Sequence, residues 1–115
     1  MAGPVVRISI GILALLALTS CTPPLYRWGS YEQSLYHMYG TPDNFNLDNE
    51  IAVLSEETEV AVERNIPVPP GKFAHLGYLY YQRGDIPLAR QAFMAEKNLY
   101  PESATFMNRF LNQLR

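Results

Sequence analysis

The spacing of prolines and glycines between Pro70 and Ser103 constrains the fold more than any other feature of the chain. Pro70 opens this stretch, Pro101 lies near its end, and Gly84 lies close to its middle. Proline stops a helix because it lacks a backbone donor and its ring clashes with the preceding turn. Glycine gives the backbone the freedom that a tight turn between two helices needs. We therefore predict two antiparallel helices, one at 72–83 and one at 87–100.

Residue size along these two helices follows a regular pattern. Small residues at Gly77 and Ala89 would let the helices approach closely, and larger side chains would fill the space around that contact. The larger residues are Phe73, Leu76, Tyr80 and Phe93, with Leu99 near the end. The pattern and its length resemble a tetratricopeptide repeat (TPR), which is a helical hairpin of this period. An unrelated helical hairpin with the same spacing by coincidence is the alternative.

Glu96 departs from the TPR pattern, which usually has alanine at that position. A carboxylate on the inner side of a helix is costly to bury without hydrogen-bond partners. We expect Glu96 to loosen the seam between repeats or to leave it wet.

Three further helices are predicted outside the hairpin. The first is Tyr31–Tyr39, with Ser30 as its N-cap and Gly40 as its stop; the second is Leu47–Asn65; the last runs from a Ser103 cap to Leu114. When the large and small positions of the first hairpin helix are shifted by one repeat length, they fall on apolar residues of the last helix. The last helix therefore resembles the capping helix that ends such arrays. Residues 28–65 are the candidate for a divergent first repeat. The expected fold is all-α: antiparallel helical hairpins of TPR-like type, with one clear repeat, one divergent repeat and one capping helix.

Apolar spacing predicts which face of each early helix is buried. The inner positions are Trp28, Tyr31, Leu35 and Met38 for the first helix, and Leu47, Ile51, Leu54, Thr58, Ala61 and Asn65 for the second. The other side of the second helix is acidic, with Glu56, Glu57, Glu59 and Glu63. We interpret these four carboxylates as a solvated helix face.

The N-terminus is typical of an export signal. A positive residue, Arg7, precedes the apolar run Ile8–Leu18, which is shorter than the ~20 residues of a membrane-spanning helix. The run ends in Leu18-Thr19-Ser20-Cys21, which resembles the lipobox of bacterial lipoproteins. This resemblance implies a diacylglycerol and an N-acyl lipid on Cys21 and no other cofactor. An ordinary secretory signal with a coincidental cysteine is the alternative.

The lipobox also implies a domain division and a location. Residues 1–20 would be the signal peptide, 21–29 the lipidated cysteine and its tether, and 30–115 the helical domain. Several acyl chains on one residue anchor a protein stably. Thr22, in place of aspartate, implies the periplasmic face of the outer membrane under the Gram-negative sorting rule. As a whole, the chain resembles a family of small Gram-negative lipoproteins of unknown function.

Composition and motifs argue against catalysis. The sequence has one cysteine, no serine-nucleophile motif and no glycine-rich phosphate loop. Neither His37 nor His75 has a second ligand at helical spacing, so we interpret both as packed or surface residues and not as metal ligands. The nine lysines and arginines are scattered and the net charge is −2, which disfavours nucleic-acid binding. We expect no enzyme activity and no metal.

The TPR resemblance implies a partner-binding groove along the first helix of the hairpin. Its candidate residues are Ala74, Tyr78, Tyr81 and Gln82. Exposed tyrosines suit a protein interface, although the same residues could simply face solvent. TPR domains that clamp a C-terminal carboxylate use asparagine and lysine on this surface, so that role does not fit Tyr78 and Gln82.

These observations favour a non-catalytic adaptor that is anchored to the outer membrane and binds envelope proteins, whose identity the sequence does not give. Regulation of peptidoglycan synthesis is one specific version of this hypothesis. An assembly factor for a pore, pilus or secretion complex is the second hypothesis. A small ligand-binding or enzymatic lipoprotein is a third hypothesis, from another class.

Overall fold

The computed structural model describes residue 3 and residues 24–115. Apart from residue 3, the expected export signal lies outside the described residues, as does Cys21. Five α-helices follow one another: α2 (Tyr31–Tyr39), α3 (Leu47–Glu63), α4 (Lys72–Arg83), α5 (Ile86–Leu99) and α6 (Ala104–Gln113), with short 3₁₀ turns at Pro42–Asn44 and Pro101–Ser103. Between residues 24 and 115 there is no strand. The predicted all-α class with helical hairpins is confirmed. None of the helices in this part of the chain is long and apolar enough to cross a membrane.

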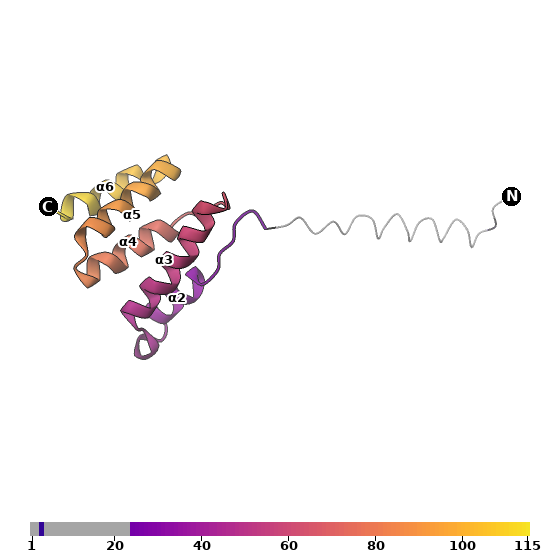
Figure 1. The fold of residues 1–115 in the computed structure, drawn as a ribbon, viewed down its shortest axis with the longest axis horizontal. Coiled ribbons are helices and arrows are strands. Elements are labelled where there is room, and N and C mark those ends of the chain that lie inside the picture. The colour runs from indigo at the N-terminus through magenta and orange to yellow at the C-terminus, as the bar shows by residue number, and fades with distance from the viewer. Residues whose placement is uncertain (1–2, 4–23) are drawn as a thin grey trace.

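The helices stack as layers, with α4 between α3 and α5 and with α6 on the far side of α5 (Figure 1). Two hydrophobic clusters hold the stack together. The first consists of Ile51, Leu54, Leu76 and Leu79, and joins α3 to α4. The second consists of Ala89, Phe93, Met107 and Leu114, and joins α5 to α6. Tyr80 packs against both clusters, so α4 links the two halves of the core.

The α4 and α5 helices lie in close contact at Gly77. A Cβ atom added there would lie 2.8 Å from both Cδ1 and Cε1 of Phe93 and 3.2 Å from the Cβ of Ala92. Ala89 and Phe93 are buried on the facing helix. The predicted close contact around small residues is therefore confirmed. The turn between the helices is at Gly84, whose φ of +86° is favourable only for glycine.

The expectation for Glu96 is wrong. Glu96 is buried, and its Oε1 accepts a hydrogen bond of 2.6 Å from the backbone N–H of Gly71. Its Oε2 accepts a weaker one of 3.4 Å from the N–H of Ala74. Burial raises the pKa of Glu96, and the backbone donors at the start of α4 oppose that rise. Gly71 has no side chain to cap α4, so a carboxylate on α5 caps α4 instead. Glu96 is neither wet nor loosening: its hydrogen bonds tie the start of α4 to α5 within the hairpin.

Helix ends and expected caps differ from the sequence prediction in several places. The second helix stops at Glu63, two residues early, because Asn65 has a left-handed φ of +54°. The α5 helix runs from Ile86 to Leu99, one residue earlier at each end. Neither expected serine cap forms: the Ser30 hydroxyl donates to Glu57 and the Ser103 hydroxyl donates to the carbonyl of Tyr100.

Some residues predicted to be buried are exposed or half-exposed. On α2 the buried residue is Ser34, whereas Trp28 before the helix is 40% exposed. Asn65 is exposed, as is Leu99 on α5. Phe73 is half-buried and lines a shallow groove between α3, α4 and α5. Cross-layer contacts, which periodicity does not encode, decide these positions.

Replacing Gly77 with leucine tests the close contact. We expect Gly77→Leu to lower the free energy of unfolding by about 3 kcal/mol or more, because the added atoms overlap Phe93 and Ala92 across the helix pair. Urea unfolding followed by circular dichroism measures this change. Gln82→Leu, which adds leucine at an exposed position of the same helix, is the control and should change stability little. Equal stability of the two variants would contradict the register.

Candidate functional site

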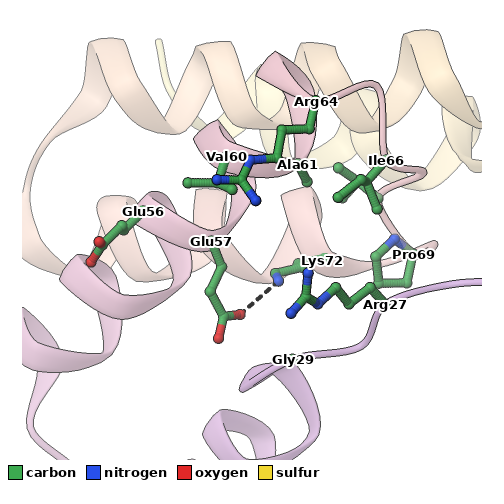
Figure 2. Close-up of a pocket in the computed structure, with 11 residues that line it drawn as sticks. Arg27, Gly29, Glu56, Glu57, Val60, Ala61, Arg64, Ile66, Pro69 and Lys72 are labelled. Atoms are coloured by element: carbon green, nitrogen blue, oxygen red, sulfur yellow. Dashed lines mark hydrogen bonds and ion pairs between the residues drawn. The ribbon is translucent and has the colours of Figure 1, made fainter.

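A cavity of about 330 Å³ lies between the chain before α2, the C-terminal half of α3 and the linker that leads into α4 (Figure 2). One part of its wall is apolar and consists of Val60, Ala61, Ile66, Val68 and Pro69. The rest consists of Gly29 and five charged residues, Arg27, Glu56, Glu57, Arg64 and Lys72. This cavity, which we call the α3 pocket, combines ionic groups with an apolar surface.

Glu57 organises the polar part of the α3 pocket. Its Oε2 accepts a 2.8 Å hydrogen bond from Nζ of Lys72. Its Oε1 accepts hydrogen bonds from the Ser30 backbone N–H at 3.1 Å and from the Ser30 hydroxyl at 2.8 Å. Burial opposes the ionisation of Glu57, but the hydrogen bonds from Lys72 and Ser30 outweigh it, and the net effect is a lowered pKa. Glu57 is therefore an ionised structural carboxylate and not part of a solvated face, as the sequence had suggested.

Lys72 is the buried partner in this ion pair. Its side chain is 4% exposed, whereas that of Glu57 is 31% exposed. A buried ammonium group is strongly destabilising unless it is paired. The Glu57–Lys72 pair thus binds the start of α4 to the middle of α3, and Lys72 has little freedom to serve a ligand.

The chain before α2 is pressed against the bundle at this pocket. Gly29 has a φ of +56°, and a Cβ atom there would collide with the carboxylate of Glu57. The ring of Trp28 stacks on Tyr31, with 6.1 Å between ring centroids and 9° between the ring planes. The last residues of the expected 21–29 tether therefore contact the folded domain.

Two arginines, Arg27 and Arg64, line the pocket. Neither Arg27 nor Arg64 forms an ion pair with any residue of 24–115. Figure 2 shows Arg64 reaching in from the end of α3 and Arg27 from the chain before α2. The sequence did not predict that Arg27 and Arg64 line one pocket, because they are far apart in the chain and neither belongs to a basic cluster.

The four residues of the predicted groove differ in their exposure to solvent. Ala74 and Tyr78 are half-buried and pack against the cluster of α5 and α6. Tyr81, 41% exposed, and Gln82 face solvent. Nε2 of Gln82 donates to the hydroxyl of Tyr78 over 3.2 Å. The open part of α4 is thus Tyr81 and Gln82, and the expectation that Tyr78 is exposed is wrong.

Both histidines make polar contacts with neighbouring elements. Nε2 of His75 lies 3.0 Å from the hydroxyl of Ser34, and Nδ1 of His37 lies 2.9 Å from Oε1 of Glu50. Burial lowers the pKa of His75 to about 4, while the nearby Glu50 has a smaller, opposite effect. In the described part of the chain, no three His, Cys, Asp or Glu side chains gather as metal ligands would.

Ser34 and His75 have the composition of a nucleophile and its base, but they are enclosed. Ser34 is 1% exposed and His75 is 7% exposed, and the ring of Tyr31 lies beside the imidazole at 5.7 Å between centroids. A substrate cannot reach a hydroxyl that is buried between α2 and α4. The pair is therefore a structural link between these helices.

Stacked helical hairpins with a charged pocket beside the N-terminal segment define a small all-α domain. The chain belongs to the DUF4810 family, described as a domain of unknown function, and the family match covers residues 25–110. This range includes α2 to α5, most of α6 and every residue of the α3 pocket. No curated protein and no solved structure matches the chain significantly.

The burial of His75 predicts a pH-dependent stability. The folded-state pKa of about 4 lies below the ordinary histidine pKa of 6.5, so between these values the unfolded chain binds a proton that the folded chain does not. Stability is then fully present above about pH 6.5 and falls by about 3 kcal/mol as the pH drops to about 4. Urea unfolding across this range measures the loss.

Two variants separate this effect from general acid destabilisation. His75→Gln keeps an amide that can bond to Ser34 but cannot titrate, so it should lose about 3 kcal/mol less than the native chain over the same pH range. Gln82→Ala, which changes an exposed residue without a titratable group, should retain the native dependence on pH. Identical pH profiles for the native chain and His75→Gln would contradict the assignment.

Proposed function

We propose that the chain is a lipoprotein of the outer membrane that faces the periplasm and acts as a non-catalytic, TPR-type adaptor for a protein of the cell envelope. The anchor rests on the lipobox-like Leu18–Cys21. The TPR assignment is supported by the α4–α5 hairpin, with its close contact at Gly77, and by the position of α6 as a cap on α5.

The observation that carries the adaptor role is the exposure of Tyr81 on the central helix. Tyr81 is 41% exposed, and Gln82 beside it is exposed as well. Tyrosine offers a large apolar ring and a polar tip, and it is frequent among the residues that dominate protein interfaces. Tyr78 supports this surface from below through its hydrogen bond with Gln82.

Two observations support a non-catalytic role. Ser34 and His75 are both buried, and Glu57 and Lys72 are joined in a structural ion pair. Each chemically suggestive group in these two sites already has a partner that explains its position. A binding surface is therefore a better account of this fold than an active site.

The anchor is tested by replacing Cys21 with serine. We expect Cys21→Ser to abolish incorporation of labelled fatty acid and to remove the protein from the outer-membrane fraction, because the serine hydroxyl cannot form the thioether that carries the diacylglycerol. Thr22→Ser, one residue further on, is the control and should leave both properties unchanged. Continued labelling of the Cys21→Ser protein would contradict the lipoprotein assignment.

The binding surface is tested by comparing two sets of tyrosine variants. Tyr81→Ala with Gln82→Ala should leave the melting temperature nearly unchanged but weaken partner capture about thirtyfold, the effect of losing about 2 kcal/mol at an interface. Tyr80→Ala should instead lower stability by about 3 kcal/mol, because Tyr80 packs against both core clusters.

Crosslinking in the native envelope followed by capture of the protein measures the first effect, and thermal melts measure the second. If the Tyr81/Gln82 variant captures the same partners in the same yield, this surface of α4 is not the interface, and the adaptor proposal loses its main support.

A further inference from the structure

The α3 pocket lies where the folded domain meets the chain that leads to Cys21. Arg27 is six residues from Cys21 in the sequence. Since a residue spans at most about 3.5 Å, the backbone at Arg27 lies within about 20 Å of the backbone at Cys21. If Cys21 carries the lipid anchor, as proposed above, the pocket is held close to the membrane surface. Figure 1 shows that α6 is at the opposite end of the stack.

The residues around Arg27 suit a membrane surface. Leu25 is 75% exposed and Trp28 is 40% exposed, and they flank the arginine in the sequence. Tryptophan is enriched where lipid headgroups meet the acyl region, and arginine can extend its charge toward the headgroups while its stem covers apolar surface. Trp28 stacks on Tyr31 on one side, while its exposed part and Leu25 remain available to an apolar surface.

Attraction to an anionic surface would come from the arginines at the pocket and not from the net charge of the chain. The whole chain has a net charge of −2, so no general positive field draws it to an anionic surface. Lys72 is already paired with Glu57. Arg27 and Arg64, in contrast, form no ion pair within 24–115. Guanidinium groups are frequent phosphate ligands in proteins, because they offer several N–H donors and a permanent positive charge.

Apart from Glu56 and Gly29, the rest of the pocket wall is apolar. Val60 and Ala61 from α3, with Ile66 and Pro69 from the linker, line the same cavity as the two arginines. An inorganic anion would leave this apolar surface without a partner. A phosphodiester that carries glycerol and acyl groups would cover it.

We propose that the α3 pocket binds the phosphate headgroup of an anionic phospholipid in the leaflet that holds the anchor. Arg27 and Arg64 contact the phosphate, the apolar wall contacts the glycerol region, and Leu25 and Trp28 enter the interface beside it. The contact fixes the orientation of the domain, with the start of α2 and the end of α3 toward the membrane and α6 toward the periplasm. This inference rests on the proposed anchoring through Cys21.

The test uses the chain from Thr22 onward, which has no anchor. Both core clusters and every contact of the pocket lie within residues 24–115, so this chain retains the fold. Trp28 is the only tryptophan and is partly exposed, which makes its fluorescence a direct probe. We expect vesicles of phosphatidylglycerol to shift the Trp28 emission to shorter wavelength and to sediment the protein, and vesicles of phosphatidylcholine to do neither.

Matched charge variants locate the contact. Arg27→Gln with Arg64→Gln should weaken vesicle binding about thirtyfold, the effect of two arginines at an anionic surface. Arg109→Gln with Arg115→Gln removes the same charge from the C-terminal region and should leave binding unchanged. Equal losses in the two double variants would show general attraction instead of a site, and no binding by the native chain would also overturn the proposal.

Soluble anions distinguish the source of the phosphate. Inorganic phosphate and glycerol phosphate, at millimolar concentration, should not displace the protein from vesicles, because they leave the apolar wall uncovered. Displacement by either one would assign the pocket to a soluble anion and overturn the lipid assignment. Since the chain tested lacks Cys21, a negative result here leaves the lipid anchor intact, and failure of the anchor would be seen separately in the Cys21→Ser fractionation.

Discussion

The close contact between α4 and α5 at Gly77 is the constraint on which the rest of the structure depends. The absence of a side chain there lets Phe93 lie directly against the α4 backbone. With α5 at that distance, Glu96 reaches the first backbone donors of α4. The position of α4 then decides where Lys72 and His75 meet α3 and α2. A side chain at position 77 would therefore disturb contacts in every layer from α2 to α5.

The buried polar groups give the stack its register. Lys72, His75 and Glu96 are all nearly inaccessible, and each is satisfied by a group from another helix or helix start. Hydrophobic contacts alone tolerate small shifts between helices, since apolar atoms have no directional preference. Hydrogen bonds of fixed length do not, because a buried polar atom that loses its partner is costly. The apolar clusters hold the helices together, and the polar contacts select one arrangement of them.

Local signals in the sequence predicted the helices well. The bounds of α2 and α4 agree with the prediction, because glycine and proline end a helix through backbone effects that do not depend on the rest of the fold. Side-chain size also predicted the contact at Gly77, because close approach requires a small residue wherever it occurs.

The candidate site could not be predicted in the same way. Ser34 and His75 are 41 residues apart, and Gly71 and Glu96 are 25 apart. No periodic pattern links such pairs. The sequence therefore predicted that Glu57 lies on a solvated helix face and that Glu96 loosens the seam between repeats or leaves it wet. The α3 pocket depends on the chain before α2 folding back onto α3. Gly29 makes this possible through its left-handed backbone, but the sequence does not show which glycines adopt that conformation.

The linker between the two hairpins has a consequence for recognition. Val68 and Pro69 are buried, the Val68 carbonyl accepts a hydrogen bond from the hydroxyl of Tyr100, and Gly71 is bonded to Glu96. The segment that could have been a hinge is therefore fastened to the end of α5. The Glu57–Lys72 ion pair also joins α3 to α4 across this linker, so a partner that touched both hairpins would meet a preformed surface. Binding then loses little conformational entropy within this domain, and a modest contact area suffices for a specific complex.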